Sequence, residues 1–553
     1  MNRTCSFCKV EFLIRDEDLA YYEKISPTLA GQKFLIPPPQ LCPWDRLVRR
    51  TANRNERFLY RSKSAKSGQE MISCYAPDSP FKIFTRDEWW SDDWDAMAFG
   101  QDFDFSRGFF EQFYELQLKV PRPPLINNKS DNSDFCNFVD GNKNCYLLTA
   151  ANDNQDCYYG TLMANNKNIV DGMWMMDSEL CYECIDCHHC YNLRFSQSCE
   201  NCSDSSFLLN CRGVKNSLFC VNVRNKEYFI FNKQATREEY ERICKEIAGS
   251  FSKYQELFQR FNTLKQQFTV RKGSNIVASE NCTGDSIYHS QNVHHGFDIF
   301  TSKDCAYLHD GLKGSDCFDV CYYDRVQFCY ESNSLMGYGY RFTNFCRDSY
   351  DLFYCDNCHG CRNCFGCVGL RKKEYCIFNK QYSKEQYEEL IVRIIRHMEA
   401  RGEWGEFFPI QYSLFPYNES IAQDFAPLTK EEALMRGWQW REKTSAELLP
   451  QQIILPDNIS ETPDSVCHEI LSCVACSKNY RLIPQEFAFY RQMKLPLPRK
   501  CPETRFLERL ALRNPFKLWQ RQCQKCNRDL KTNYAPDRSE TVHCDECYME
   551  GIY

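Results

Sequence analysis

The stretch CDNCHGCRNCFGC, residues 355–367, carries five cysteines at strict three-residue spacing. An earlier stretch, CYECIDCHHC at residues 181–190, has four cysteines at the same spacing. Such runs have three explanations: a metal or iron–sulfur cluster, a set of disulfides, or the packing of small apolar side chains. Both runs lie in the middle of a chain with 36 cysteines, so the choice between these explanations decides the fold.

Composition limits the class of protein. The 553 residues are too many for one hydrophobic core, so several domains are expected. An apolar share of 43%, a charged share of 26% and an aromatic share of 15% indicate a globular chain rather than a disordered one. The formal net charge of −6 argues against a general binder of polyanions.

The expected location is a cytoplasm. No apolar run reaches about 18 residues, so no membrane span is predicted. The first residues, MNRTCSFCKVEF, lack the apolar core of a signal peptide. A cytoplasm keeps thiols reduced, which makes disulfides the weakest of the three explanations.

The middle of the chain is duplicated. Residues 211–243 align with residues 358–390 after a shift of 147 positions, and the block IFNKQ occurs in both. We therefore expect two copies of one module, at about 134–268 and 280–400. Capping boxes predict the starts of the helix that closes each copy and of one further short helix: Thr236 with Glu239, Ser383 with Gln386, and Thr429 with Glu432.

A shorter period runs inside each copy. Cysteines recur nine residues apart, as in Cys181, Cys190 and Cys199, with Asn, Asp, Ser, Gly and aromatic residues between them. This mixture is typical of short strands joined by tight turns. It predicts a β-solenoid with an eighteen-residue coil made of two nine-residue half-turns. Three-residue spacing fits if residues i and i+3 lie on either side of a corner and both point inward, whereas one straight strand needs even spacing.

Packing is the favoured explanation for the central cysteines. Free cysteine behaves as a small buried hydrophobe, and residues that cannot replace an essential metal ligand occupy the same phases: Leu193, Ser196, Ser205, Val214, Ser349 and Leu352. An iron–sulfur cluster or a solenoid-bound metal is the alternative. The bacterial ferredoxin motif C-x2-C-x2-C-x3-C-P differs, because the last gap here is two residues and Tyr191 and Phe365 stand near the place of its proline.

The two ends of the chain form a second duplication. Residues 42–78 and 501–537 align after a shift of 459 positions and share the block YAPD. The C-terminal copy also holds two CxxC knuckles separated by seventeen residues, the pattern of a closed tetrahedral zinc site. A segment of about 30 residues has too little core to fold without such an ion. The predicted ligands are Cys523, Cys526, Cys544 and Cys547.

A second kind of zinc site is predicted upstream in each copy. Its ligands in the N-terminal copy are Cys5, Cys8, Cys42 and Asp45. In the C-terminal copy they are Cys473, Cys476 and Cys501, with an unknown fourth ligand. Thr504 is a poor zinc ligand, and His468 is a possible substitute. In all, one to three zinc ions are expected.

The N-terminal copy lacks the ligands of the ribbon site. The same alignment places four residues other than cysteine at the ligand positions: Ser64, Ser67, Thr85 and Glu88. We therefore predict no zinc at these positions and expect packing to hold this part of the chain. Aromatic residues follow at once, beginning with Trp89, Trp90 and Trp94.

Several stretches resemble a family of uncharacterised zinc-ribbon proteins of reduced-genome bacterial lineages. They are RNERFLY, EWWSDDWD, DFDFSRGFFEQF, YNES, APLTKEEAL, LPDNI and YAPDRSETVHCDECY. The resemblance implies architecture only and carries no established activity. The family pattern has CPxCR where this chain has Asp45 and Thr504, and it has cysteines near Ser64 and Ser67, so this chain departs from it at both places.

The expected architecture is mainly β with α. It comprises two tandem Cys-rich β-solenoid modules with closing helices, flanked by N- and C-terminal zinc-ribbon-like modules. The predicted boundaries are 1–125 for a degenerate zinc ribbon with an aromatic extension, 126–268 and 269–410 for the solenoids, 411–466 for a linker, and 467–553 for the C-terminal ribbon. Long ordered faces of this kind favour a non-catalytic scaffold that binds a macromolecular partner.

Nucleic-acid binding is the first alternative function, because basic residues cluster in both ribbon copies. The candidates are Arg46, Arg50, Arg54, Arg57, Arg513 and Arg521. An iron–sulfur or redox-sensing role for the cysteine runs is a further alternative.

An enzyme is disfavoured, since scattered acids such as Asp171, Asp310 and Asp319 suit turns. Five histidines near cysteines could bind metal, although solvent-facing turns are the commoner explanation: His188, His189, His294, His295 and His359. No nucleotide-binding or hydrolase motif occurs in its proper context.

Overall fold

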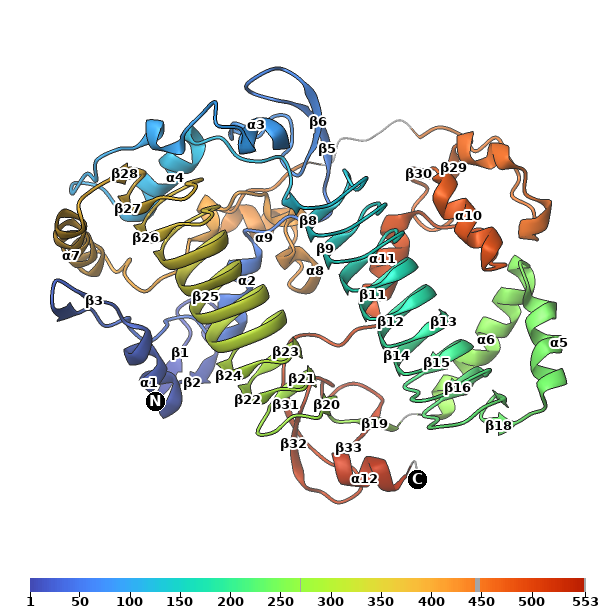
Figure 1. Ribbon diagram of the computed structural model, residues 1–553. Coiled ribbons are helices and arrows are strands. Elements are labelled where there is room, and N and C mark those ends of the chain that lie inside the picture. The colour runs from blue at the N-terminus through green and yellow to red at the C-terminus, as the bar shows by residue number, and fades with distance from the viewer. Residues whose placement is uncertain (269, 443–447, 552–553) are drawn as a thin grey trace.

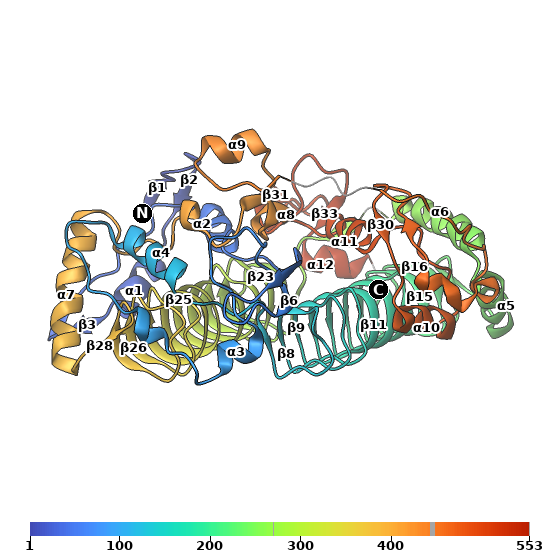
Figure 2. The ribbon, with the colours of Figure 1, turned by 90° about the horizontal axis from the view of Figure 1, so that it is seen from above.

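The computed structural model describes residues 1–268, 270–442 and 448–551. The chain is mainly β, and two ribbed coils of parallel strands lie side by side in it (Figure 1). Seen from above, the terminal modules and most helices lie along one side of the coils, and the ribs form the other side (Figure 2). Position 269, where the second solenoid is expected to begin, lies outside the described residues.

Coil 1, residues 127–234, is one sheet whose strands pair in parallel except for the antiparallel pair at its end. Its strands are β7 (Asn127–Asn128), β8 (Asn137–Asp140), β9 (Thr149–Asn152), β10 (Thr161–Ala164), β11 (Lys167–Met176), β12 (Glu179–His188), β13 (Tyr191–Arg194), β14 (Gln197–Glu200), β15 (Ser203–Leu209), β16 (Leu218–Val221), β17 (Phe229–Ile230) and β18 (Lys233–Gln234).

Coil 2, residues 276–381, has the same construction and also ends in an antiparallel pair. Its strands are β20 (Ile276–Val277), β21 (Gly284–Tyr288), β22 (Gln291–His294), β23 (Gly296–Phe300), β24 (Lys303–Ala306), β25 (His309–Phe353), β26 (Arg362–Phe365), β27 (Glu374–Ile377) and β28 (Lys380–Gln381).

The turns of both coils take 12 residues, except for 11-residue turns in coil 2 such as the first, where Ile276 pairs with Ile287. Thr149 pairs with Thr161 and Thr161 with Met173 in coil 1, and Cys364 pairs with Cys376 in coil 2. The expected eighteen-residue coil is therefore wrong. Every third residue has a positive φ, for example 53° at Asn144 and 55° at Asp153, so each turn has four three-residue sides joined at left-handed corners. Nine residues span three of these four sides, which explains the cysteine period.

The corner geometry points one side chain per side inward, as expected for residues spaced by three. Cysteines stack at 12-residue intervals, as in the register pair Cys187 and Cys199. Three inward asparagines stack in the same way: Asn154 Nδ2 donates to Asn142 Oδ1 at 3.0 Å, and Asn166 Nδ2 donates to Asn154 Oδ1 at 3.0 Å. Their buried amides thus satisfy one another.

Three helices close the coils: α5 (Arg237–Ile247) and α6 (Phe251–Gln267) after coil 1, and α7 (Lys384–Ala400) after coil 2. Helices α5 and α7 begin where the capping boxes predict, whereas α6 begins after its N-cap Ser250, for which no capping box is predicted. The side chains of Thr236 and Ser383 each accept a hydrogen bond from the backbone N–H of the third helical residue. The side chain of that residue, Glu239 or Gln386, accepts from the backbone N–H of the capping residue. Helix α6 covers a ladder of corner phenylalanines. These are Phe195, Phe207, Phe219 and Phe231, with successive centroids 5.2, 4.7 and 4.7 Å apart.

The N-terminal module covers coil 2. Its elements are β1 (Asn2–Thr4), β2 (Glu11–Leu13), α1 (Asp16–Ile25), β3 (Thr28–Leu29), β4 (Gln32–Lys33), α2 (Pro43–Thr51), β5 (Tyr60–Lys63), β6 (Glu70–Ser73), α3 (Arg86–Trp90) and α4 (Phe109–Lys119), with a 3-10 turn at Ala96–Phe99. Helices α1 and α2 both contact β25.

The C-terminal module covers coil 1 through α11, which contacts β11. Its elements are β29 (Leu471–Ser472), β30 (Asn479–Tyr480), α10 (Pro484–Gln492), α11 (Pro502–Ala511), β31 (Trp519–Gln522), β32 (Asp529–Thr532), β33 (Thr541–His543) and α12 (Asp545–Glu550). The pairs α2/α11, β5/β31, β6/β32 and α3/α12 start 459 positions apart, as the sequence duplication predicts. Strand β33 also pairs with β19 (Val270–Lys272), just before coil 2.

The predicted linker, residues 411–466, contains the expected short helix α9 (Lys430–Met435), which begins at the capping box of Thr429 and Glu432. Helix α8 (Ala422–Phe425) and 3-10 turns at Ile410–Tyr412, Tyr417–Glu419, Ile459–Glu461 and Asp464–His468 complete the segment. Residues 443–447 of the predicted linker lie outside the described residues.

Candidate metal centres

Three clusters of potential metal ligands lie in the terminal modules. In the part of the chain that the structure describes, these are the groups of three or more Cys, His, Asp or Glu whose ligand atoms all lie within 4.8 Å of one another. We name them the ribbon centre (Cys523, Cys526, Cys544, Cys547), the aspartate centre (Cys5, Cys8, Cys42, Asp45) and the threonine centre (Cys473, Cys476, Cys501). The sequence predicts all three groups.

The ribbon centre is built from two knuckles. Cys523 and Cys526 follow strand β31, and Cys544 is the N-cap of helix α12. The Cys526 and Cys544 sulfurs are 3.7 Å apart, and the Cys544 N–H points to Cys523 Sγ at 3.3 Å. Burial and then the hydrogen bonds among the thiols, with a smaller effect of the Cys523 charge, raise the pKa of Cys547 to about 12. A bound dication would favour the thiolate form.

The aspartate centre joins the β1–β2 hairpin to the start of helix α2. Cys42 is the N-cap of α2, and its Sγ lies 3.7 Å from Cys8 Sγ. Asp45 Oδ2 lies 3.0 Å from Cys5 Sγ and 3.4 Å from Cys42 Sγ. Because the Asp45 carboxylate lies next to the three sulfurs, it is placed to act as a fourth ligand. Asp45 is 9% exposed.

The threonine centre has the same layout in the C-terminal module. Cys501 is the N-cap of helix α11, and its Sγ lies 3.7 Å from Cys476 Sγ. The side chain beside the three sulfurs is Thr504, whose Oγ1 lies 3.3–3.4 Å from each of them. His468, the substitute ligand considered from the sequence, is not part of the cluster.

Hydrogen bonds replace the ribbon ligands in the N-terminal module. Ser64 donates to the Glu88 carboxylate, and Thr85 and Glu88 form a capping box at the start of α3. Ser64 Oγ also accepts from the Ser67 N–H at 3.4 Å. Burial opposes ionisation of Glu88, but hydrogen bonds from Ser64, Ser67 and Thr85 outweigh it and lower the pKa of Glu88 to about 2. A polar network therefore occupies the degenerate site.

Restoring the ligands at this degenerate site should create a metal centre. In the variant S64C/S67C/T85C/E88C, the backbone already has the knuckle-and-helix layout of the ribbon centre. We expect one additional zinc ion per chain by elemental analysis. The same number of ions as in the wild type, in a variant that still folds, would contradict the structural equivalence of the two sites.

The central cysteines line the coils and do not gather into clusters. Along the runs at 181–190 and 355–367, each Sγ lies 3.2–3.6 Å from the carbonyl oxygen two residues earlier. Serines in the same phase make the same contact: Ser205 Oγ donates to Ser203 O at 2.7 Å, and Ser349 Oγ donates to Arg347 O at 2.9 Å. These contacts support the packing explanation.

A serine at a central position should therefore be tolerated. We expect Cys358→Ser to leave the metal content unchanged and to alter the free energy of unfolding by about 1 kcal/mol, the usual size for a point substitution. Elemental analysis and urea denaturation measure the two quantities. Loss of a bound metal ion from this variant would show that the central thiols are ligands.

The basic residues proposed for nucleic-acid contact are largely buried, which corrects that assignment. On helix α2, Arg46 Nε lies 2.9 Å from Asp319 Oδ1, and Arg50 Nη1 lies 3.1 Å from Asp319 Oδ1 and 2.8 Å from Glu331 Oε2. Arg46 is 1% exposed and Arg50 is fully buried. Arg54 is buried too, with its guanidinium 3.7 Å from the centroid of the Phe138 ring.

The remaining candidates are also engaged. Arg57 pairs with Asp424 at 2.5 Å, and Arg513 pairs with Asp298 at 2.6 Å. Arg521 is half-buried and donates to Ala535 O at 3.2 Å. All six candidate arginines are therefore engaged by contacts within the chain.

The same arrangement recurs on the other coil. On helix α11, Arg505 Nε lies 2.8 Å from Asp171 Oδ2, and Arg509 Nη1 lies 2.9 Å from Asp171 Oδ1. Asp171 is fully buried in coil 1, as Asp319 is in coil 2. We name these two sets of ion pairs the arginine clamps. Each one joins a helix that begins at a candidate metal ligand to a buried carboxylate at a corner of a coil.

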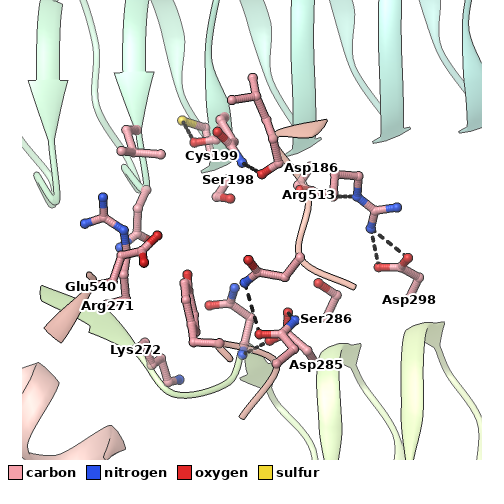
Figure 3. A pocket seen from close by; sticks show the side chains of 18 of the residues that line it. Asp186, Ser198, Cys199, Arg271, Lys272, Asp285, Ser286, Asp298, Arg513 and Glu540 are labelled. Carbon is pink, nitrogen blue, oxygen red and sulfur yellow. Dashed lines mark hydrogen bonds and ion pairs between the residues drawn. The ribbon is translucent and has the colours of Figure 1, made fainter. Parts of the chain in front are cut away.

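A cavity of about 580 Å³ lies where coil 1, α6, coil 2 and the C-terminal module meet (Figure 3). Arg513 reaches Asp298 on one side of it, and Arg271 and Glu540 lie on the opposite side. Burial raises the pKa of Asp186 to about 7 against the opposing effect of Arg513. His188, expected on a solvent-facing turn, is instead 3% exposed, and burial lowers its pKa to about 3.

No protein-family model matches the chain, and no curated protein matches it. Among the described residues, no helix combines the length and the apolar character needed to cross a membrane.

Proposed function

We propose that the protein is a non-catalytic, zinc-binding scaffold. In this proposal coils 1 and 2 are β-solenoid modules that present an ordered surface to a macromolecular partner, and zinc-ribbon-like modules at both ends hold them in place. The 12-residue register and the repeated left-handed corners support the solenoid assignment.

Sulfur geometry supports zinc as the metal. Zn–S bonds of about 2.3 Å place the sulfurs of a tetrahedral site about 3.8 Å apart. The pairs Cys526/Cys544, Cys8/Cys42 and Cys476/Cys501 all have sulfur–sulfur distances of 3.7 Å. Sets of thiolates, alone or with one carboxylate, also match the donor preference of structural zinc sites.

The arginine clamps are the observation that carries the proposal. Helices α2 and α11 begin at Cys42 and Cys501, so an ion at those cysteines would fix the helix starts. Their arginines pair with carboxylates at the corners of the coils, those of the N-terminal module on coil 2 and those of the C-terminal module on coil 1. Metal binding would in this way hold both coils between the two ends of the chain, which is a structural role.

Coil 1 has an uncovered polar column suited to a partner. Exposed or half-exposed residues 12 positions apart pair along it: Asp131, Lys143, Gln155, Lys167, Glu179, Tyr191, Ser203, Lys215 and Glu227. An adjacent corner ladder stiffens the column, with Asn132 donating to Asn144 and Asn144 to Asp156, both at 3.1 Å. Repeat proteins use such faces for binding.

Site-specific photocrosslinking in cells tests the scaffold role. A photoreactive amino acid at Lys143, Lys167 or Tyr191 should give a discrete macromolecular adduct, and the same amino acid at Arg242, exposed on α5, should not. The absence of an adduct from all three coil positions would contradict the proposal. An adduct that disappears after nuclease treatment would identify the macromolecular partner as a nucleic acid.

A further inference from the structure

The aspartate and threonine centres differ at one position. Asp45 and Thr504 both stand three residues after the N-cap cysteine of their helix. In the threonine centre, Thr504 Oγ1 lies 3.4 Å from Cys473 Sγ, 3.3 Å from Cys501 Sγ and 3.4 Å from Cys476 Sγ. The hydroxyl therefore faces the same side of the three sulfurs on which the aspartate centre has its carboxylate.

The two oxygens differ as ligands. Zinc in proteins is bound by thiolate, imidazole and carboxylate, and three protein ligands with a fourth exchangeable one make an open site. The Asp45 carboxylate completes a set of four anionic donors. The neutral Thr504 hydroxyl does not, so an ion held by the three cysteines would need a fourth ligand from outside the chain.

The threonine centre is also accessible. Cys476 and its counterpart Cys8 are both exposed, but at the fourth position Thr504 is half-exposed and Asp45 is buried. A small molecule such as water or a thiol can therefore reach the fourth position without a rearrangement of the coil wall.

We propose that the threonine centre binds zinc with an exchangeable fourth ligand, either water or a small thiol, and that it is the labile centre of the three. The inference rests on the proposed function, since it requires zinc at this centre. The ligand class follows from the metal: a thiolate is a favoured zinc donor, and water fills the position in its absence.

Release of the zinc ion from the threonine centre would weaken the arginine clamp on coil 1. Cys501 is the N-cap of α11, and the next turn of this helix carries Arg505, which pairs with Asp171 at 2.8 Å. Release of the ion would loosen the start of α11 and therefore its ion pairs. The aspartate centre, with four protein ligands, would keep the clamp on coil 2 closed under the same conditions.

The test is metal exchange with a chromophoric chelator on the full-length protein loaded with zinc. In the wild type we expect one zinc ion to exchange fast and two to exchange slowly. In Thr504→Cys all three ions should exchange slowly. The zinc affinity of the threonine centre should also rise by at least about tenfold, since loss of outer-shell partners alone changes metal affinity roughly 10–100-fold. Asp45→Thr should instead give two fast ions and one slow ion.

Thr504→Val is the matched control. It keeps the shape of threonine and removes the hydroxyl, so exchange should stay as in the wild type if the hydroxyl is not a ligand. Faster exchange in Thr504→Val would show that Oγ1 binds the ion and would overturn the inference.

Cobalt substitution gives the second readout. Addition of 2-mercaptoethanol should increase the sulfur-to-cobalt charge-transfer absorption of the wild type and leave Thr504→Cys unchanged. Zinc bound in all three centres with equal exchange rates would overturn this inference and leave the proposed function standing. An absence of metal from the threonine centre would overturn the proposed function at that centre.

Discussion

Replacing Asp319 by asparagine should lower the free energy of unfolding by about 3–5 kcal/mol, the size of effect found when one partner of a buried ion pair is removed. Asp319 is fully buried and lies 2.9 Å from Arg46 Nε and 3.1 Å from Arg50 Nη1. Without this carboxylate, the remaining ion-pair partner that the structure describes for Arg46 is Glu331, at 4.0 Å from its Nε. Urea denaturation followed by tryptophan fluorescence measures the loss.

The matched control is Asp304→Asn, which changes the same residue type on an exposed corner of the same coil. Its effect should stay within about 0.5 kcal/mol. The substitution Asp171→Asn should repeat the large loss on coil 1, because Asp171 holds the other clamp. If Asp319→Asn lowers the free energy of unfolding no more than Asp304→Asn does, the arginine clamps do not stabilise the fold.

Removal of zinc from the ribbon centre should unfold the C-terminal ribbon. The apparent free energy of zinc binding in zinc-finger peptides is about 10–16 kcal/mol, and it is also their folding free energy. The double variant C523S/C526S should therefore lose one ion and the hairpin of β31 and β32. Its pairing of β33 with β19 should be lost as well. Limited proteolysis with mass spectrometry should find new cleavage within residues 519–551.

The matched control for this variant is S64A/S67A, which changes the corresponding knuckle of the N-terminal module. It should keep the wild-type number of metal ions, because no ligand is removed there. A ribbon that stays resistant to protease in C523S/C526S would contradict the metal-dependent folding of this segment.

The sequence predicts local features well. Capping boxes at Thr236, Ser383 and Thr429 give correct helix starts because each depends on only four consecutive residues. The cysteine groups of the three centres are brought together as expected, since the knuckles are short and the duplication displays their spacing twice.

The coil period could not be read from the cysteines. Inward positions recur every three residues, so spacings of nine and 12 both fit the cysteine pattern. Only the register between neighbouring turns distinguishes them, as in the pair Cys187 and Cys199. Register depends on contacts between strands, and a cysteine count does not contain this information.

The burial of the arginines differs most from the sequence-based expectation, which treated them as available to nucleic acid. A basic helix face has the same sequence whether solvent or carboxylates cover it. A signal was nevertheless present. Asp171 and Glu183 have counterparts in Asp319 and Glu331, 148 positions later, just as Arg46 and Arg50 recur as Arg505 and Arg509. Acids and bases duplicated together indicate two equivalent contacts between the modules.

Metal analysis of the full-length protein, purified without oxygen and combined with a visible spectrum, tests the central claim that the terminal thiols bind metal and the central thiols pack the coils. We expect three zinc ions per chain, one for each terminal centre, with no visible absorption. Iron with acid-labile sulfide, at any stoichiometry that requires the cysteines of residues 181–190 or 355–367 as ligands, would contradict it.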